Sequence, residues 1–113
     1  MPVRVGEERM WIGLNDGWLS IVENWNNDDE LLVRARKLIH LTNVFPDCDY
    51  FKDSDADYPY RAYISREQVG ETIKQRLMAT NYTNFKASVE DTQMKALYAE
   101  MWNLVYFRFI NDR

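Results

Sequence analysis

The sequence holds one cysteine, Cys48, and one histidine, His40, among its 113 residues. A lone cysteine excludes an internal disulfide and a zinc site built from several thiolates, and it is typical of a reducing compartment. A lone histidine excludes every site that needs two imidazole ligands. The common disulfide-dependent and zinc-dependent classes of protein are therefore ruled out.

Glycine and long apolar runs are also scarce. The four glycines are scattered, and none belongs to a glycine-rich phosphate-binding motif. No apolar run approaches the roughly 18 residues of a membrane span, so we expect no membrane insertion. Residues 1–9 carry four charges and no apolar stretch follows them, so we expect no signal peptide. The expected location is the cytoplasm.

The composition that remains suits a folded domain. Apolar residues make up 46% of the chain and aromatic residues 14%, and 14 Lys and Arg against 18 Asp and Glu give a net charge of −4. The length matches a single domain, which typically holds about 100–150 residues. We expect a polar lead-in over residues 1–9 and a single α+β domain over residues 10–110.

Two kinds of pattern predict about four strands. Residues 10–14 and 18–22 are apolar, β-prone runs, and residues 31–36 and 58–64 alternate between two faces. An Asn-Asp-Gly sequence separates the first two segments, which is typical of a β-hairpin with Gly17 available for the left-handed conformation.

Helical spacing predicts a short helix over residues 37–45, a helix that begins after Ser65, and a long helix over residues 92–109. Ser65 and the glutamine three residues later form a capping box. Strands that mostly precede helices favour an α+β fold. We expect an antiparallel or mixed sheet of about four strands, with two or three helices packed on one face. The apolar stripe expected on the middle helix consists of Val69, Ile73 and Leu77.

Several segments follow one another in a characteristic order and spacing. They are MWI at 10–12, DGWLSIV at 16–22, LLVRAR at 31–36, DADYPYR at 55–61, NYTNFK at 81–86 and the pair Tyr98 and Trp102. In these segments the chain resembles a family of short uncharacterised proteins of bacteria and their phages, over roughly residues 10–106. The resemblance implies a bacterial or phage origin and a cytoplasmic location, in a bacterial cell or an infected bacterial host, and it carries over no catalytic role.

Candidate metal ligands are limited to an acidic loop. Asp53, Asp55 and Asp57 begin like a calcium-binding loop, but Tyr58 stands where that loop needs glycine and Ile64 where it needs a bidentate glutamate. We therefore expect no metal site, no cofactor and no catalytic residue. A metal-dependent hydrolase built on these aspartates is the enzymatic alternative.

A cysteine–histidine pair is the other catalytic possibility. Asp47 and Asp49 flank Cys48, and their negative charges raise a thiol pKa and oppose formation of the reactive thiolate. We expect no catalysis by Cys48, and we expect His40 to be at the surface or half-buried.

Aromatic residues near acidic loops predict a protein-binding surface. Exposed aromatic side chains are common anchors of protein interfaces, and the acidic loops complement a basic partner. The apolar end of the last helix, residues 104–110, suggests a homodimer as a further possibility. The predicted partner-binding residues are Asp53, Asp55, Asp57, Tyr58, Tyr60 and Trp25.

A basic sheet face gives the alternative binding surface. If the strands at 31–36 and 58–64 are neighbours in suitable register, guanidinium groups and an aromatic ring share one face, which suits phosphates and stacked bases. The net charge of −4 favours a nucleotide over a long duplex. A competing interpretation pairs Arg61 with Asp55 or Asp57. The residues of this alternative ligand-binding face are Arg34, Arg36, Arg61 and Tyr63, with Trp11 or Trp18 as an extension.

These features predict a small non-catalytic binding protein that acts on a host macromolecule, for example a phage inhibitor of a bacterial defence or nucleic-acid enzyme. The alternative is a nucleotide-binding or single-stranded nucleic-acid-binding module that uses the Arg/Tyr sheet face.

Overall fold

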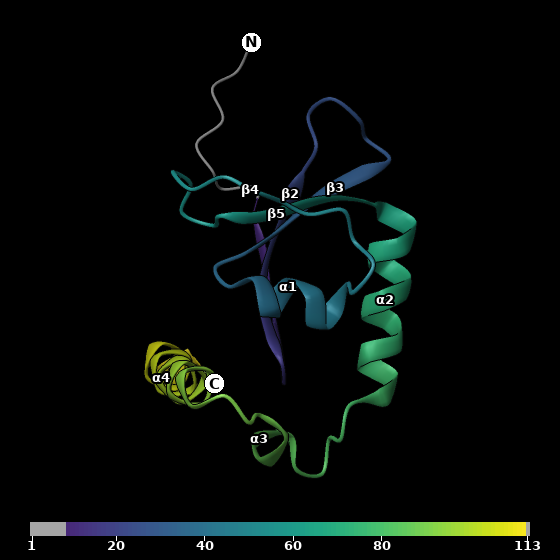
Figure 1. The fold of residues 1–113 in the computed structure, drawn as a ribbon. Coiled ribbons are helices and arrows are strands. Elements are labelled where there is room, and N and C mark those ends of the chain that lie inside the picture. Colours follow the sequence, from purple (N-terminus) through teal and green to yellow (C-terminus); the bar gives the residue numbers. More distant parts are fainter. Residues whose placement is uncertain (1–8, 113) are drawn as a thin grey trace. The chain divides into compact units, whose positions relative to one another are not determined.

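The computed structural model describes residues 9–112 (Figure 1). The chain divides into two compact units, Met1–Thr80 and Asn81–Arg113. All strands of the described residues lie in the first unit. The polar lead-in predicted for residues 1–9 lies outside the described residues, apart from Arg9.

An antiparallel sheet organises the first unit. Within the described residues, five strands run in the order β1-β2-β3-β5-β4, and each neighbouring pair is antiparallel. The predicted α+β class is confirmed. The fifth strand, β4, has only two residues, too few for an alternation pattern to indicate it. The strands are β1 (Met10–Leu14), β2 (Gly17–Glu23), β3 (Glu30–Ala35), β4 (Phe51–Lys52) and β5 (Tyr60–Ser65).

The hairpin between β1 and β2 is confirmed, but the predicted role of its glycine is wrong. Residues 15–16 form the turn, because Leu14 pairs directly with Gly17. Gly17 does not adopt the left-handed conformation. A Cβ atom at Gly17 would instead lie 2.8 Å from the carbonyl oxygen of His40 in α1 (Leu38–Val44). Glycine is needed here so that α1 can approach the sheet closely.

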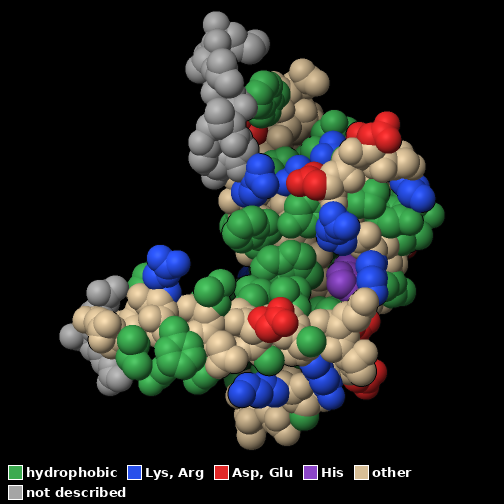
Figure 2. All heavy atoms as spheres, turned by 90° about the vertical axis from the view of Figure 1, so that its left-hand side faces the viewer, with side chains coloured by type: hydrophobic (Ala, Val, Ile, Leu, Met, Phe, Trp, Pro, Cys, Tyr) green, Lys and Arg blue, Asp and Glu red, His purple; other side chains and the backbone are tan. Residues whose placement is uncertain are grey.

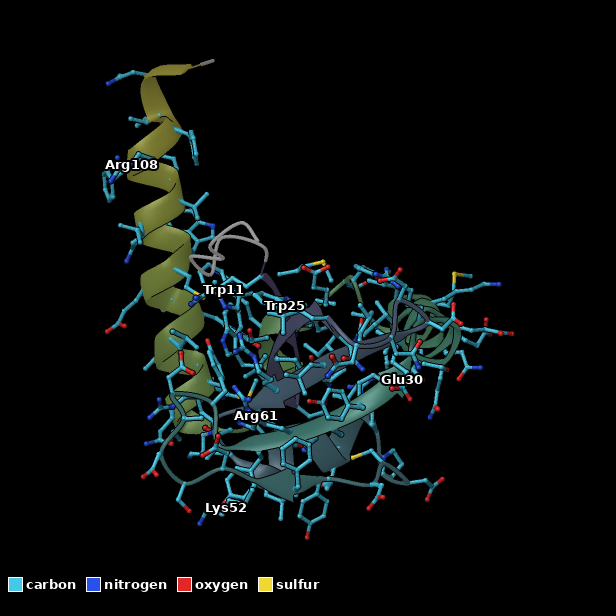
Figure 3. All side chains as sticks on the ribbon, turned by 90° about the horizontal axis from the view of Figure 1, so that it is seen from above. Trp11, Trp25, Glu30, Lys52, Arg61 and Arg108 are labelled. Atoms are coloured by element: carbon cyan, nitrogen blue, oxygen red, sulfur yellow. The ribbon has the colours of Figure 1, made fainter. Side chains whose placement is uncertain are left out.

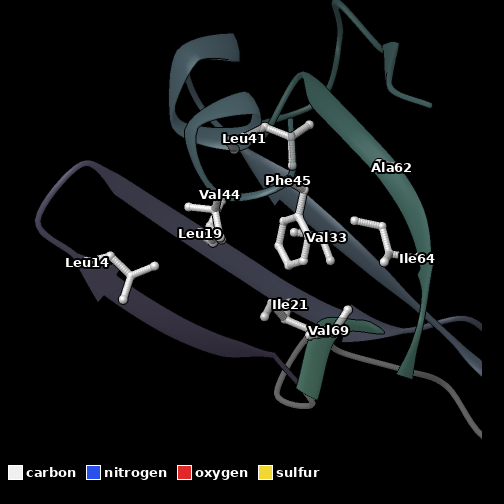
Figure 4. Close-up of a cluster of buried hydrophobic side chains, with 11 residues drawn as sticks. Leu14, Leu19, Ile21, Val33, Leu41, Val44, Phe45, Ala62, Ile64 and Val69 are labelled. Atoms are coloured by element: carbon white, nitrogen blue, oxygen red, sulfur yellow. The ribbon is translucent and has the colours of Figure 1, made fainter. Parts of the chain in front are cut away.

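The hydrophobic core lies between one face of the sheet and helices α1 and α2 (Arg66–Ala79) (Figures 1 and 4). Leu19, Val33 and Leu41 are fully buried. Full burial of a side chain of this size stabilises the fold by about 1.5–3 kcal/mol. The core residues are Leu14, Leu19, Ile21, Val33, Ala35, Leu41, Val44, Phe45, Ala62, Ile64 and Val69.

Helix α2 begins as the capping box predicts, with Ser65 Oγ accepting a hydrogen bond from the Gln68 N–H at 3.1 Å. The predicted apolar stripe holds only in part. Val69 is buried, Ile73 is half-buried and Leu77 is 51% exposed. A repeat of four residues drifts by about 40° per step on a helix with 3.6 residues per turn, so Leu77 has rotated away from the core.

The second unit contains three helical segments in its described residues: α3 (Phe85–Ser88), α4 (Thr92–Phe109) and the short η1 (Ile110–Asp112). The side chains of Asn84 and Asp91 cap α3 and α4. The predicted long helix is thus confirmed with its bounds. Its apolar end carries exposed side chains: Leu104, Val105, Tyr106, Phe107 and Phe109.

Candidate functional site: an arginine-centred sheet face

The second face of the sheet carries basic and aromatic side chains. Side chains alternate between the two faces along a strand, and directly paired residues project to the same face. The sheet residues that point away from α1 therefore form one surface, which Figure 3 views from above the sheet. Val22 and Leu32 also lie on this surface, because Leu32 pairs with Tyr63 and Val22 pairs with Leu32. We use the name arginine face for its basic, hydroxyl and aromatic residues: Trp11, Trp18, Ser20, Arg34, Phe51, Arg61 and Tyr63.

Two arginines stand at its centre. Arg34 on β3 pairs directly with Arg61 on β5, which is the register that the alternative prediction required. Arg34 also pairs with Ser20 on β2, and its Nη2 donates a hydrogen bond to Ser20 Oγ at 2.7 Å. The ring of Tyr58 lies over the Arg34 guanidinium group, 5.0 Å from it. Arg34 is consequently only 8% exposed.

The loop that supplies Tyr58 is held by arginines through its backbone. Arg61 Nε donates to the carbonyl oxygen of Tyr58 at 3.1 Å, and Arg36 donates to the carbonyl oxygen of Asp57. Among the residues that the structure describes, neither arginine forms an ion pair with Asp55 or Asp57. The competing interpretation, which paired Arg61 with Asp55 or Asp57, correctly predicted that Arg61 binds this loop. It was wrong about the acceptors, because the arginines bind backbone carbonyl oxygens and not the carboxylates.

Electrostatics at the centre are unfavourable for a cation. Burial lowers the pKa of Arg34, and the positive charges of Arg61 and Arg9 lower it further, whereas the nearby Asp57 raises it. A guanidinium group nonetheless stays protonated because its ordinary pKa exceeds 12. The centre of the arginine face therefore holds several positive charges close together.

Two aromatic pairs lie on either side of this centre. The rings of Trp11 and Trp18, on β1 and β2, stack at a centroid distance of 6.3 Å. The rings of Phe51 and Tyr63, on β4 and β5, stack at 5.7 Å. Trp11 is 54% exposed and Tyr63 is 48% exposed. These rings present flat apolar surfaces next to guanidinium groups.

The predicted partner-binding residues do not form one surface. Asp53, Asp55 and Asp57 are exposed in the loop before β5, and the half-buried Tyr58 belongs to the same loop. Tyr60 lies on the core side of the sheet, because it pairs with Ala35. Trp25 is exposed in the loop before β3. The two loops are at opposite ends of β3, since β3 and β5 are antiparallel.

His40 and Cys48 form the cysteine–histidine pair that the sequence analysis considered for catalysis. His40 is buried, which corrects the expectation that it is exposed or half-buried, and its Nδ1 accepts a hydrogen bond from the Trp18 N–H at 3.4 Å. Burial raises the pKa of Cys48, and the charges of Asp49 and Asp47 raise it further. The direction of this shift agrees with the prediction, and it opposes thiolate formation.

Three residues of the site, Ser20, Phe51 and Tyr58, were missed by the sequence reasoning. Phe51 lies on the two-residue strand β4. Ser20 alternates with Trp18 on β2, so the period of two could have placed it on the arginine face. Tyr58 was assigned to a partner-binding surface, and only the three-dimensional course of its loop brings it over Arg34.

The chain matches no known family model, no curated protein and no solved structure. Across residues 9–112, no helix is long and apolar enough to cross a membrane. In the same residues, no three His, Cys, Asp or Glu side chains gather in a way that could hold a metal ion.

Proposed function

We propose that the protein is a non-catalytic binding protein and that its arginine face binds a nucleotide or a short single-stranded nucleic acid. The bases stack on the Trp11–Trp18 and Phe51–Tyr63 pairs, and a phosphate group pairs with the guanidinium groups between them. The observation that supports this proposal is the direct pairing of Arg34 with Arg61 between two aromatic pairs, of which Trp11, Phe51 and Tyr63 are exposed and Trp18 is half-buried. Stacking platforms beside positive charge are the usual means of binding single strands.

The register of the sheet supports a short single strand as the ligand. Five residues of the face lie in one row across the strands, because each pairs directly with the next: Trp11, Ser20, Arg34, Arg61 and Phe51. Neighbouring strands lie about 4.8 Å apart, so Trp11 and Phe51 are separated by roughly 19 Å across the sheet. A strand of a few nucleotides along this row would place bases at the aromatic ends and a phosphate group at the arginines.

The charge distribution also supports a short ligand over a long duplex. The chain carries a net charge of −4, and the side of the molecule in Figure 2 shows basic and acidic side chains interspersed. Extended duplex binding depends on many phosphate contacts and counterion release. One or two phosphate groups need only the arginines at the centre of the face.

Calorimetric titration with a mononucleotide, a dinucleotide and a longer single-stranded oligonucleotide tests this proposal. Arg61→Ala and Trp11→Ala should each weaken binding, the tryptophan change by roughly 5-fold to 150-fold, because stacking contributes about 1–3 kcal/mol per base. Arg66→Ala and Tyr82→Ala are matched controls outside the arginine face and should leave affinity unchanged. Equal affinity of all four variants would overturn the proposal.

A protein partner is the second candidate function, and the acidic loop favours it. The arginines bind the loop through its carbonyl oxygens, so the carboxylates of Asp53, Asp55 and Asp57 remain exposed. An inhibitor encoded by a phage, directed at the basic surface of a bacterial nucleic-acid enzyme, is one form of such a protein. Reversing these three charges should then abolish a salt-sensitive complex. A reversal of Glu67 and Glu71, which lie outside the loop, should leave that complex intact. Retention of that complex by the triple variant would remove this candidate.

A further inference from the structure

The stability of the fold does not explain why a charged residue, Arg34, is buried in the sheet. Its side chain is more than nine-tenths buried, and its Nε has no hydrogen-bond partner among the described residues. Its contacts are a neutral hydroxyl group, on Ser20, and the ring of Tyr58. A buried charge without a carboxylate partner is costly, and buried donors without partners are rare in folded proteins. Buried polar groups that lack suitable partners concentrate at functional sites.

The groups around Arg34 suit an oxyanion rather than a neutral ligand. Arg61 stands directly opposite Arg34, and within residues 9–112 its only hydrogen bond is the one from Nε to the Tyr58 carbonyl oxygen. The terminal nitrogens of Arg61 are thus available as donors. Ser20 Oγ already accepts from Arg34, so its own hydrogen can be donated to a third group.

The loop that covers Arg34 is held by bonds that an oxyanion can replace. Arg36 and Arg61 donate to backbone carbonyl oxygens of Asp57 and Tyr58. These acceptors are neutral, whereas a phosphate group carries negative charge and can accept two hydrogen bonds from one guanidinium group. A phosphate group that reaches Arg61 therefore attracts its guanidinium group more strongly than the loop carbonyl does.

We propose that Arg34, Arg61 and Ser20 form an oxyanion subsite for a phosphate group, and that Tyr58 is a displaceable cap over it. This proposal rests on the proposed function and names where the phosphate group binds. In the described structure, the ring of Tyr58 takes the place over Arg34 that the ligand takes when it binds. The phosphate oxygens accept from Arg34 Nε, from the terminal nitrogens of Arg61 and from the Ser20 hydroxyl group.

Inorganic phosphate, titrated into the full chain against chloride at equal ionic strength, is the direct probe. The Nε–H signals of Arg34 and Arg61 are followed by nitrogen-15 NMR, with Arg66 at the start of α2 as an internal control. Phosphate should shift the first two signals in a saturable way and leave Arg66 unmoved. Arg34→Lys, which keeps the charge but removes Nε, should weaken phosphate binding by roughly 10-fold or more, as expected for a lost hydrogen bond between charged groups.

Two variants of Tyr58 test its proposed role as a displaceable cap. Tyr58→Ala should strengthen phosphate binding because the ring no longer competes for Arg34, whereas Tyr58→Phe should leave it unchanged because the ring remains. Weaker or equal phosphate binding by Tyr58→Ala would overturn the cap. If Arg34→Lys does not fold, Arg61→Gln serves in its place, and unchanged phosphate binding by that variant would overturn the subsite.

The outcomes separate this inference from the proposed function. If a dinucleotide binds in a manner that depends on Trp11 while phosphate leaves the Arg34 signal unmoved, the oxyanion subsite is wrong and the proposed function stands. If phosphate binds at Arg34 and no nucleotide binds more tightly than phosphate, the subsite stands and base stacking is wrong. If neither ligand binds, both proposals are wrong.

Discussion

Arg34 and Arg61 face each other as direct partners on the neighbouring antiparallel strands β3 and β5. Like charges in directly opposed positions destabilise a sheet. Burial adds to this cost, since it lowers the pKa of Arg34, and the charge of Arg61 lowers it further. The direct partners of this pair among the described residues are carbonyl, hydroxyl and aromatic groups. The charge of Asp57 offsets part of the cost at Arg34 without forming an ion pair with it. The fold therefore retains an electrostatically unfavourable pair at the centre of its candidate site.

Replacing Arg34 by an apolar residue should not destabilise the fold. We predict that Arg34→Met combined with Ser20→Ala leaves the free energy of unfolding unchanged or raises it by up to about 4 kcal/mol, as found when buried charges give way to apolar residues of similar volume. Urea denaturation checks this, with Arg66→Met as the exposed control, for which a change within about 0.5 kcal/mol is expected. A loss of more than about 2 kcal/mol in the double variant would show that Arg34 is retained for stability.

The close approach of α1 to the hairpin predicts that replacing Gly17 or Gly70 by alanine changes the stability of the fold in opposite directions. Gly17→Ala should destabilise the fold by about 1–3 kcal/mol, because the new Cβ would lie 2.8 Å from the His40 carbonyl oxygen and force a backbone shift. Gly70 in α2 has no atom within 4 Å of an added Cβ, so Gly70→Ala should stabilise the helix by about 0.5–1 kcal/mol. Thermal unfolding of both variants checks the pair, and equal effects would contradict the close packing of α1 against Gly17.

Helix α1 offers a matched test of the core. Leu41 is fully buried between α1 and the sheet, whereas Ile39 on the same helix is exposed. Leu41→Ala should lower the free energy of unfolding by about 2–5 kcal/mol, and Ile39→Ala should change it by less than about 0.5 kcal/mol. Denaturant titration measures both. A comparable loss at Ile39 would mean that α1 presents a different face to the sheet.

The thiol of Cys48 should be slow to react. Burial and the charges of Asp49 and Asp47 raise its pKa, so at neutral pH a smaller fraction is thiolate than for an ordinary cysteine, and the rate of alkylation should keep rising with pH above the usual thiol range. Asp49→Asn should lower the pKa and speed alkylation, while Asp53→Asn should not. A pH–rate profile with iodoacetamide checks this, and a midpoint below the usual thiol range would contradict it.

Local sequence patterns predicted which side chains of β3 and β5 lie on the arginine face, but not which strands are neighbours. Alternation along residues 31–36 and 58–64 correctly separated the core side chains, such as Val33 and Ala62, from the arginines on the other face. The pairing of Arg34 with Arg61 could only be stated as a condition. It depends on two strands far apart in sequence coming together in one register, and nothing local to either strand determines which strands become neighbours.

Loops and close contacts account for what the sequence did not predict. The position of Tyr58 over Arg34 depends on backbone bonds from Arg36 and Arg61 to its loop, which no local pattern encodes. Gly17 was correctly placed at a hairpin, but its role comes from contact with α1, which follows later in the sequence. Trp25 and the acidic loop were grouped by their chemistry, and the strand order separates them.

Titration of the isotope-labelled full chain with a dinucleotide tests the central claim most directly, because Trp25 and Arg66 provide internal controls in the same spectrum. Binding at the arginine face predicts saturable shifts of the indole N–H signals of Trp11 and Trp18 and of the Nε–H signals of Arg34 and Arg61, with the two controls unmoved. Unmoved signals at all four positions, or equal shifts at the controls, would contradict the assignment of the arginine face as a nucleotide-binding surface.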